Sequence, residues 1–134
     1  MALAATVIYT KVANYVSTWH IKSLGGLHWT DDDVYIIKAN NEPAFCIEPG
    51  VMLNEGSDST PSEMTSNERE KLSLIAYYGY QVNPIVENYG ITQSVIWEEY
   101  GDELLSTELP NYANRKEEII AQISRHHMKP SFHN

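Results

Sequence analysis

The spacing of apolar side chains changes partway along the chain, and this change restricts the fold more than any other feature of the sequence. Residues 5–9 and 34–37 are rich in β-branched and aromatic side chains, and Gly25-Gly26 interrupts the pattern between them. A polar stretch dense in turn-forming residues occupies positions 54–63. Apolar residues then recur at helical spacing. We therefore expect an α+β domain whose β-rich N-terminal part, a small sheet or barrel, precedes about three helices.

The three helices are expected at definite places after the polar stretch. The first should run from about residue 66 to Gly79. The second should begin at Thr92, whose side chain can cap the free amides of the first turn, and stop at Gly101. The third should span about residues 112–128. The expected core-facing positions are Leu72, Ile75, Ala76 and Gly79 on the first helix and Tyr112, Ile119, Ile120, Ile123 and His127 on the third.

Length and charge narrow the class of protein. The 134 residues suit one domain, and residues 1–134 end without a polar tail, so we expect a domain cut from a longer protein. Nine basic and 18 acidic residues give a net charge of −9, which argues against nucleic-acid and anionic-membrane partners. No apolar run approaches the roughly 18 residues that a membrane helix needs, so membrane insertion is not expected.

The chain has one cysteine, Cys46, so neither an intramolecular disulfide nor a zinc site built on paired cysteines can form. Strand alternation places Phe45 and Ile47 on one face of the expected strand and Ala44, Cys46 and Glu48 on the other. We therefore expect the thiol to lie on an open face. The alternative is that Cys46 packs in the core as a small hydrophobic residue.

Gln93 is expected in the first turn of the second helix, on the same face as Ile96, Trp97 and Tyr100. The ordinary interpretation is a structural glutamine that bonds to the backbone. The free amides and positive dipole of a helix start would also stabilise an oxyanion on the carboxamide. A thiol and such a carboxamide are the two reactants for an internal thioester, with ammonia as the leaving group.

Three segments carry a family resemblance. Residues 44–50 (AFCIEPG), 76–80 (AYYGY) and 92–97 (TQSVIW) together resemble the thioester domains of Gram-positive bacterial surface adhesins. In that family the cysteine of the first segment and the glutamine of the third form the thioester, which implies a Cys46–Gln93 crosslink. Val95 stands where the family commonly has alanine. The 46 residues between Cys46 and Gln93 resemble the short form of the domain.

The resemblance implies covalent adhesion. An amine, most simply a lysine side chain of a host surface or matrix protein, or a small amine, would attack the Gln93 acyl carbon and leave an isopeptide-type amide. Cys46 would depart as thiolate, so the domain would act once and would not be a turnover enzyme. No cofactor is expected. The same resemblance implies an extracellular, cell-wall-anchored parent protein with a role in virulence, and we expect a monomer.

Six residues are candidates for supporting the thioester site: Glu48, Tyr78, Tyr80, Thr92, Trp97 and His28. The aromatic members would exclude water from the stored bond. A metal site is not expected. Residues 31–33 (DDD) lack the spaced oxygens and glycine of a calcium loop, and His126, His127 and His133 lack a pair at helical i, i+4 spacing.

Two other functions remain open at the level of sequence. One is a papain- or transglutaminase-like cysteine amidase that uses Cys46 with His28 or His20 as the base. Such enzymes place the cysteine at a helix start, whereas Pro49-Gly50 here turns the chain soon after Cys46. The other is a non-covalent binding module with an inert thiol.

Overall fold

The structure, a computed structural model, describes residues 7–13, 15–22, 25, 27–31, 34–39, 41–48, 51–53 and 66–128. The strands are β1 (Val7–Ala13), β2 (Ser17–Ile21), β3 (Leu27–Asp31), β4 (Val34–Ala39), β5 (Glu42–Glu48), β6 (Val51–Leu53) and β7 (Glu103–Thr107). The helices are α1 (Ser66–Ala76), the π-helical segment η2 (Tyr77–Gln81), α2 (Val86–Glu99) and α3 (Tyr112–Met128). The polar stretch 54–63 lies outside the described residues.

The strands form two antiparallel sheets. One has the order β1-β4-β5-β6 and the other the order β3-β2-β7. β4 and β5 are joined through Asn41, whose φ of 67° is a left-handed conformation that asparagine tolerates. The expected α+β class, with a β-rich N-terminal part and three helices, is confirmed. β7 was not predicted: it lies between α2 and α3 in the sequence and pairs with β2.

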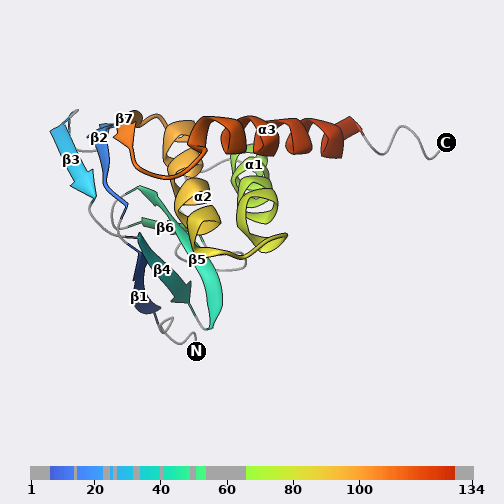
Figure 1. Cartoon of the computed structure of the whole chain (residues 1–134). Coiled ribbons are helices and arrows are strands. Elements are labelled where there is room, and N and C mark those ends of the chain that lie inside the picture. Colours follow the sequence, from blue (N-terminus) through green and yellow to red (C-terminus); the bar gives the residue numbers. More distant parts are fainter. Residues whose placement is uncertain are drawn as a thin grey trace.

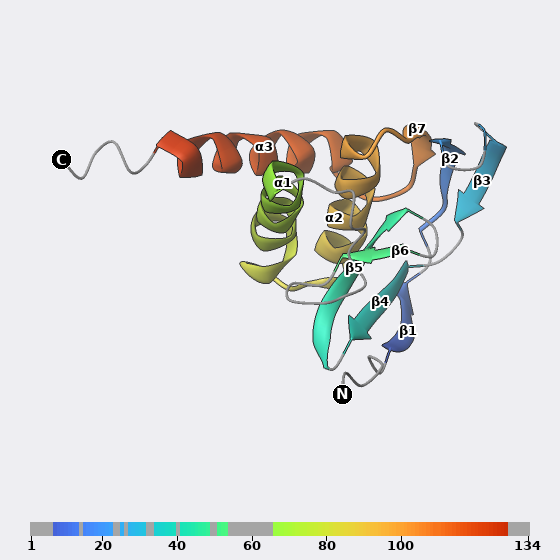
Figure 2. The same cartoon turned by 180° about the vertical axis from the view of Figure 1, so that it is seen from behind.

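α2 is the central element of the fold. It contacts β4 and β5 of one sheet, β7 of the other, and both α1 and α3. α3 crosses one end of α1 and α2, whereas the four-stranded sheet lies toward the other end of α2 (Figure 1; Figure 2). Trp19 of β2 and Trp97 of α2 meet edge to face with ring centroids 5.3 Å apart, which joins the second sheet to the core. None of the described helices is long and apolar enough to cross a membrane.

The third helix agrees closely with expectation, since α3 runs from Tyr112 to Met128. Ile119 and Ile123 are buried as predicted. Ile120, which we expected in the core, is 46% exposed. The reason is geometric, because consecutive helix residues point about 100° apart and Ile119 already faces the core. The side chain of His127 lies outside the described residues.

The first helix does not end at Gly79. The α-helical hydrogen bonding of α1 stops at Ala76, and the chain continues without a break into the π-helical segment η2, which contains Gly79. A side chain at this position would be blocked by α2, because an ideal Cβ on Gly79 would lie 2.2 Å from Oγ1 of Thr92. Gly79 is therefore a site of close helix packing rather than a helix stop.

The second helix starts earlier than predicted. α2 begins at Val86, so Thr92 lies in mid-helix with a fully buried side chain and caps nothing. Ile85, in an extended conformation, precedes the first turn and makes no side-chain cap. A local side-chain contact holds this end instead, since Asn88 in the first turn of α2 donates from Nδ2 to the main-chain oxygen of Asn83 at 2.9 Å.

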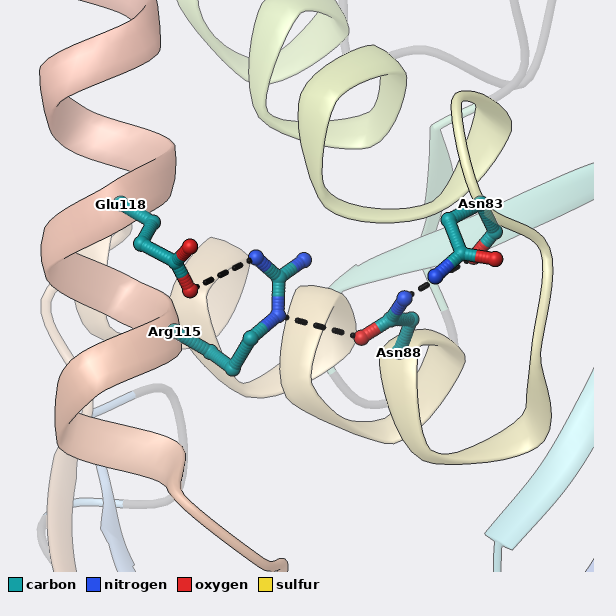
Figure 3. Close-up of polar contacts among 4 residues, drawn as sticks. All are labelled: Asn83, Asn88, Arg115 and Glu118. Carbon is teal, nitrogen blue, oxygen red and sulfur yellow. Dashed lines mark hydrogen bonds and ion pairs between the residues drawn. The ribbon is translucent and has the colours of Figure 1, made fainter.

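Two polar groups of contacts attach α3 to α2. In the first, the Tyr112 hydroxyl donates a short hydrogen bond to Glu98, and Lys116 pairs with the same carboxylate at 3.0 Å. Burial and this hydrogen bond raise the pKa of Tyr112 well above its usual range. In the second, Arg115 extends from α3 to Asn88 on α2 and to Glu118 on its own helix (Figure 3).

Removing the Arg115 guanidinium is expected to destabilise the domain. Nε of Arg115 donates to Oδ1 of Asn88 at 3.2 Å, and Asn88 is only 4% exposed, so Arg115→Met leaves a buried acceptor without this donor. We expect a loss of about 1–2 kcal/mol in the free energy of unfolding, measured by urea denaturation. The control is Glu118→Gln, which weakens only the exposed end of the network and should change stability little. Equal losses in both variants would contradict the assignment.

Candidate functional site: a helix side chain paired with a strand backbone

The site begins where β4 and β5 separate. Their paired register ends at Ile37 and Ala44. The Tyr89 hydroxyl of α2 lies at this point, where it accepts the Ile37 N–H at 3.1 Å and donates to the Ala44 carbonyl at 2.6 Å. Tyr89 is only 2% exposed, so its hydroxyl satisfies two main-chain groups that no water could reach easily. The tyrosine therefore bridges the two strands as they diverge.

Cys46 is the next residue along β5 with its main-chain groups on the same edge as those of Ala44. The carboxamide of Gln93 fills the position that β4 leaves. The Cys46 N–H donates to Oε1 of Gln93 at 2.8 Å, and Nε2 of Gln93 donates to the Cys46 carbonyl at 2.5 Å. A single side-chain amide thus pairs with both main-chain groups of the cysteine. We call this pair of hydrogen bonds the carboxamide clamp.

Trp97 completes the contacts to this edge. Its indole Nε1 donates to the Cys46 carbonyl at 2.9 Å, so that oxygen accepts two hydrogen bonds. Tyr89, Gln93 and Trp97 are spaced four residues apart and therefore lie along one face of α2. Through these three side chains the helix supplies the hydrogen bonds that a neighbouring strand would otherwise make.

The group that can stabilise charge on the Gln93 carbonyl differs from the one expected. Because α2 starts at Val86, Gln93 lies in the middle of the helix, and the free amides and positive end of the dipole are not beside its carbonyl. The group that can stabilise negative charge on Oε1 is instead the N–H of Cys46. The residue that carries the thiol thus also supplies the oxyanion donor.

The surroundings of Cys46 differ from the expected open strand face. Phe45 is 2% exposed and Ala44 is fully buried, so both faces of β5 are covered at this point. Cys46 itself is half-buried and packs against the hydrophobic residues on both sides. The expectation of an open face was wrong, because Ala44, which shares a face with Cys46, is fully buried and Cys46 packs against buried residues of both hydrophobic clusters.

The structure separates the aromatic candidates. Tyr80 is buried and packs edge to face on Phe45 and Tyr89, behind the strand that carries Cys46. The Tyr78 hydroxyl instead contacts Nδ1 of His126 on α3 at 2.9 Å. Of the expected aromatic group, Trp97 bonds directly to Cys46, Tyr80 packs behind it, and Tyr78 directs its polar group elsewhere.

Among the candidate acid Glu48 and the candidate bases His28 and His20, His20 alone has a described side chain. The side chains of Glu48 and His28 lie outside the described residues. The main chain of His28 is in β3 of the three-stranded sheet, whereas Cys46 is in the four-stranded sheet. His20, the other candidate base, bonds to Glu103 on β7 at 2.9 Å.

No cluster of three or more His, Cys, Asp or Glu side chains occurs within the described ranges. Asp32, Asp33 and His133 fall outside those ranges, as does the side chain of Asp31.

Tyr89 is the site residue that sequence reasoning missed. Its signal was present, because it lies four residues before Gln93 just as Trp97 lies four residues after it. Starting the helix at Thr92 excluded Tyr89 from this face. Extending the helix by two turns toward the N-terminus would have placed all three side chains together.

Two hydrogen bonds hold the Gln93 carboxamide against the main chain of Cys46, the single cysteine of the chain, although the two residues lie far apart in the sequence. A family model described as "Thioester domain" matches residues 43–125, more than half of the chain. The chain belongs to the thioester domain family. The solved thioester domain of the Staphylococcus aureus TIE protein matches with a TM-score of 0.71 and 25% sequence identity. The comparison with curated proteins finds no match.

The structural match covers 90% of this chain and 54% of the solved chain, so this chain spans about half the length of that structure. Together with the family model it confirms the resemblance that the three sequence segments indicated. Family membership supports a general role in covalent adhesion and implies an extracellular location.

Proposed function

We propose that the domain forms a Cys46–Gln93 thioester and uses it once to bind covalently to an amine, most simply a lysine side chain on a host surface or matrix protein. The observation that carries the proposal is the carboxamide clamp, in which the main chain of Cys46 holds the Gln93 side chain at 2.8 and 2.5 Å. The N–H and C=O groups that hold Gln93 flank the Cα of Cys46, and Sγ is two bonds from that Cα. The clamp therefore brings the Gln93 side chain close to the residue that carries the thiol.

Formation of the thioester would proceed by attack of the Cys46 thiolate on Cδ of Gln93. Negative charge would develop on Oε1, where the Cys46 N–H already donates. Nε2 would take up the proton released by the thiol and leave as ammonia. The Cys46 carbonyl, which accepts a hydrogen bond from Nε2, orients this leaving group.

Trp97 continues to donate a hydrogen bond to the Cys46 carbonyl after ammonia has left. Loss of Nε2 removes one of the two donors to the Cys46 carbonyl, and the Trp97 indole N–H remains as the other. The carbonyl lies against the buried Trp97 indole, which packs on Trp19, so an unpaired acceptor there would be costly. The same buried rings limit the approach of water, the competing nucleophile.

Binding to a partner would reverse the geometry of formation. The amine nitrogen attacks the acyl carbon, the carbon–sulfur bond breaks, and the attacking nitrogen gives one proton to the departing sulfur. Thiolate leaves readily because an ordinary thiol has a pKa of about 8.5, well below that of a lysine amine at about 10.4. The amide product does not regenerate the thioester, so the domain acts once rather than as an enzyme with turnover.

Family membership and net charge support a proposal for where the reaction takes place. We propose a cell-wall-anchored parent protein on a Gram-positive bacterium, with the domain presented to host molecules as a virulence factor. The net charge of −9 favours encounter with basic, lysine-rich surfaces through long-range attraction. No cofactor or metal is needed for either acyl-transfer step.

Intact mass spectrometry tests the proposal. The purified chain is expected to be lighter than its sequence by one ammonia, and incubation with methylamine should add one methylamine while releasing the Cys46 thiol. Cys46→Ala is the matched control, because it keeps the main-chain clamp but removes the nucleophile; it should show the full sequence mass and no adduct. A wild-type chain of full mass with a freely titrating thiol in denaturant would refute the crosslink. An intact crosslink that methylamine leaves unchanged would refute the binding role.

A further inference from the structure

We propose that the Cys46 carbonyl restricts the reactive amine to ammonia and primary amines, so that secondary amines, including N-methylated lysine, are excluded. This inference rests on the proposed amine reaction and specifies its substrate class. It is carried by the short contact of 2.5 Å between Nε2 of Gln93 and the Cys46 carbonyl oxygen.

That contact marks where the reactive nitrogen lies. Ammonia departs from the position of Nε2, and by microscopic reversibility an incoming amine reaches the acyl carbon along the path by which ammonia left. At 2.5 Å only a hydrogen atom fits between nitrogen and oxygen. A carbon substituent that points in this direction would collide with the carbonyl oxygen. One position on the attacking nitrogen must therefore carry hydrogen.

The proton balance leads to the same restriction. A primary amine that has added to the acyl carbon carries two hydrogens on its nitrogen. One is transferred to the departing Cys46 sulfur. The other remains on the nitrogen and donates a hydrogen bond to the Cys46 carbonyl. A secondary amine carries a single hydrogen in the same adduct. That hydrogen cannot both hold the carbonyl contact and leave with the thiolate.

The carbonyl is also held in place, so it cannot turn aside for a bulkier nucleophile. The Trp97 indole N–H donates to it at 2.9 Å, and Trp97 is only 7% exposed and packed against Trp19. Main-chain pairing of Cys46 with Met52 fixes β5 from its other edge. The acceptor is thus a rigid part of the site.

The test compares amines on the crosslinked wild-type protein by mass spectrometry. Methylamine and dimethylamine have nearly the same basicity, so at one pH both offer nearly the same fraction of free amine. Each rate is divided by the rate of the same amine with a small acyclic alkyl thioester in the same buffer, which removes intrinsic nucleophilicity. Isopropylamine is the control for crowding, because it is branched beside the nitrogen and keeps both N–H hydrogens.

The normalised rate for dimethylamine is expected to be roughly 10- to 100-fold below that for methylamine, the factor that a lost hydrogen bond to a charged group produces. Isopropylamine should stay within a few-fold of methylamine. Equal normalised rates for dimethylamine and methylamine would overturn the selectivity and leave the adhesion proposal standing, as would an isopropylamine rate as low as that of dimethylamine. Failure of methylamine itself to react with the crosslinked protein would instead overturn the proposed function and this inference with it.

Discussion

Cys46→Ala is expected to lower the free energy of unfolding by about 4 kcal/mol, through loss of the crosslink between residues 46 and 93. A covalent bond between these positions closes a loop of 46 intervening residues and restricts the unfolded chain as a disulfide would. The loop-entropy relation for a closure of this size gives a stabilisation on the order of 4 kcal/mol. The fold itself should survive, because the main chain of residue 46 still makes the carboxamide clamp.

The clamp makes the two partner residues unequal. Cys46→Ala removes the crosslink but leaves Gln93 with an intact carboxamide that can make both hydrogen bonds, whereas Gln93→Ala removes the crosslink and the clamp together. Gln93→Ala is therefore expected to lose about 1–2 kcal/mol more than Cys46→Ala. The double variant should be no less stable than Gln93→Ala, because the second substitution finds no crosslink left to remove.

Urea denaturation of the four proteins, each checked by intact mass, measures these differences. Cys46→Ser serves as a second control, since it nearly conserves the size of the side chain and still prevents thioester formation. It should match Cys46→Ala within a few tenths of a kcal/mol. Additive losses in the double variant would show that Cys46 and Gln93 contribute independently, and the crosslink would then not explain either position.

The elements that could be predicted from the sequence are those with one face against the core and the other toward solvent. α3 has Ile119 and Ile123 against the core and charged residues toward solvent, so its helical period is visible and both ends were predicted correctly. α2 has no such period, because nearly every residue from Asn88 to Trp97 is buried. A helix covered on all sides shows no polar face. Without that pattern to mark the true start at Val86, the common use of threonine as a capping residue pointed to Thr92 as the N-cap.

The remaining errors have non-local causes. β7 exists because it pairs with β2, more than 80 residues earlier in the chain, and its own residues alternate weakly and are mostly exposed. The covering of Cys46 likewise depends on α2, which follows β5 by almost 40 residues. Local motifs named Cys46 and Gln93 as a pair, yet the hydrogen bonds between them depend on the separation of β4 from β5, which no sequence spacing encodes.

Gly79→Ala is expected to disturb the site without touching Cys46 or Gln93. The new Cβ would lie 2.2 Å from Oγ1 of Thr92 and 3.1 Å from its Cβ and Cγ2, so η2 and α2 must move apart. Threonine has few alternative rotamers in a helix, and a buried one has little room to turn. Thr92 immediately precedes Gln93, so a displacement of α2 by about 1 Å would stretch the clamp beyond hydrogen-bond distance.

We expect Gly79→Ala to cost about 1–3 kcal/mol of stability, as overpacked cores do, and to leave most molecules without the crosslink. Adding Thr92→Ala removes the closest atom, Oγ1, together with Cγ2, which should restore the crosslinked mass. Thr92→Val is the matched control for the hydroxyl: within the described part of the chain Oγ1 is buried without a hydrogen-bond partner, so its removal should be neutral or stabilising. Intact mass, recorded where circular dichroism shows each variant folded, decides the outcome. A folded Gly79→Ala protein with the full crosslinked fraction, or a double variant that stays uncrosslinked, would show that this helix contact does not position Gln93.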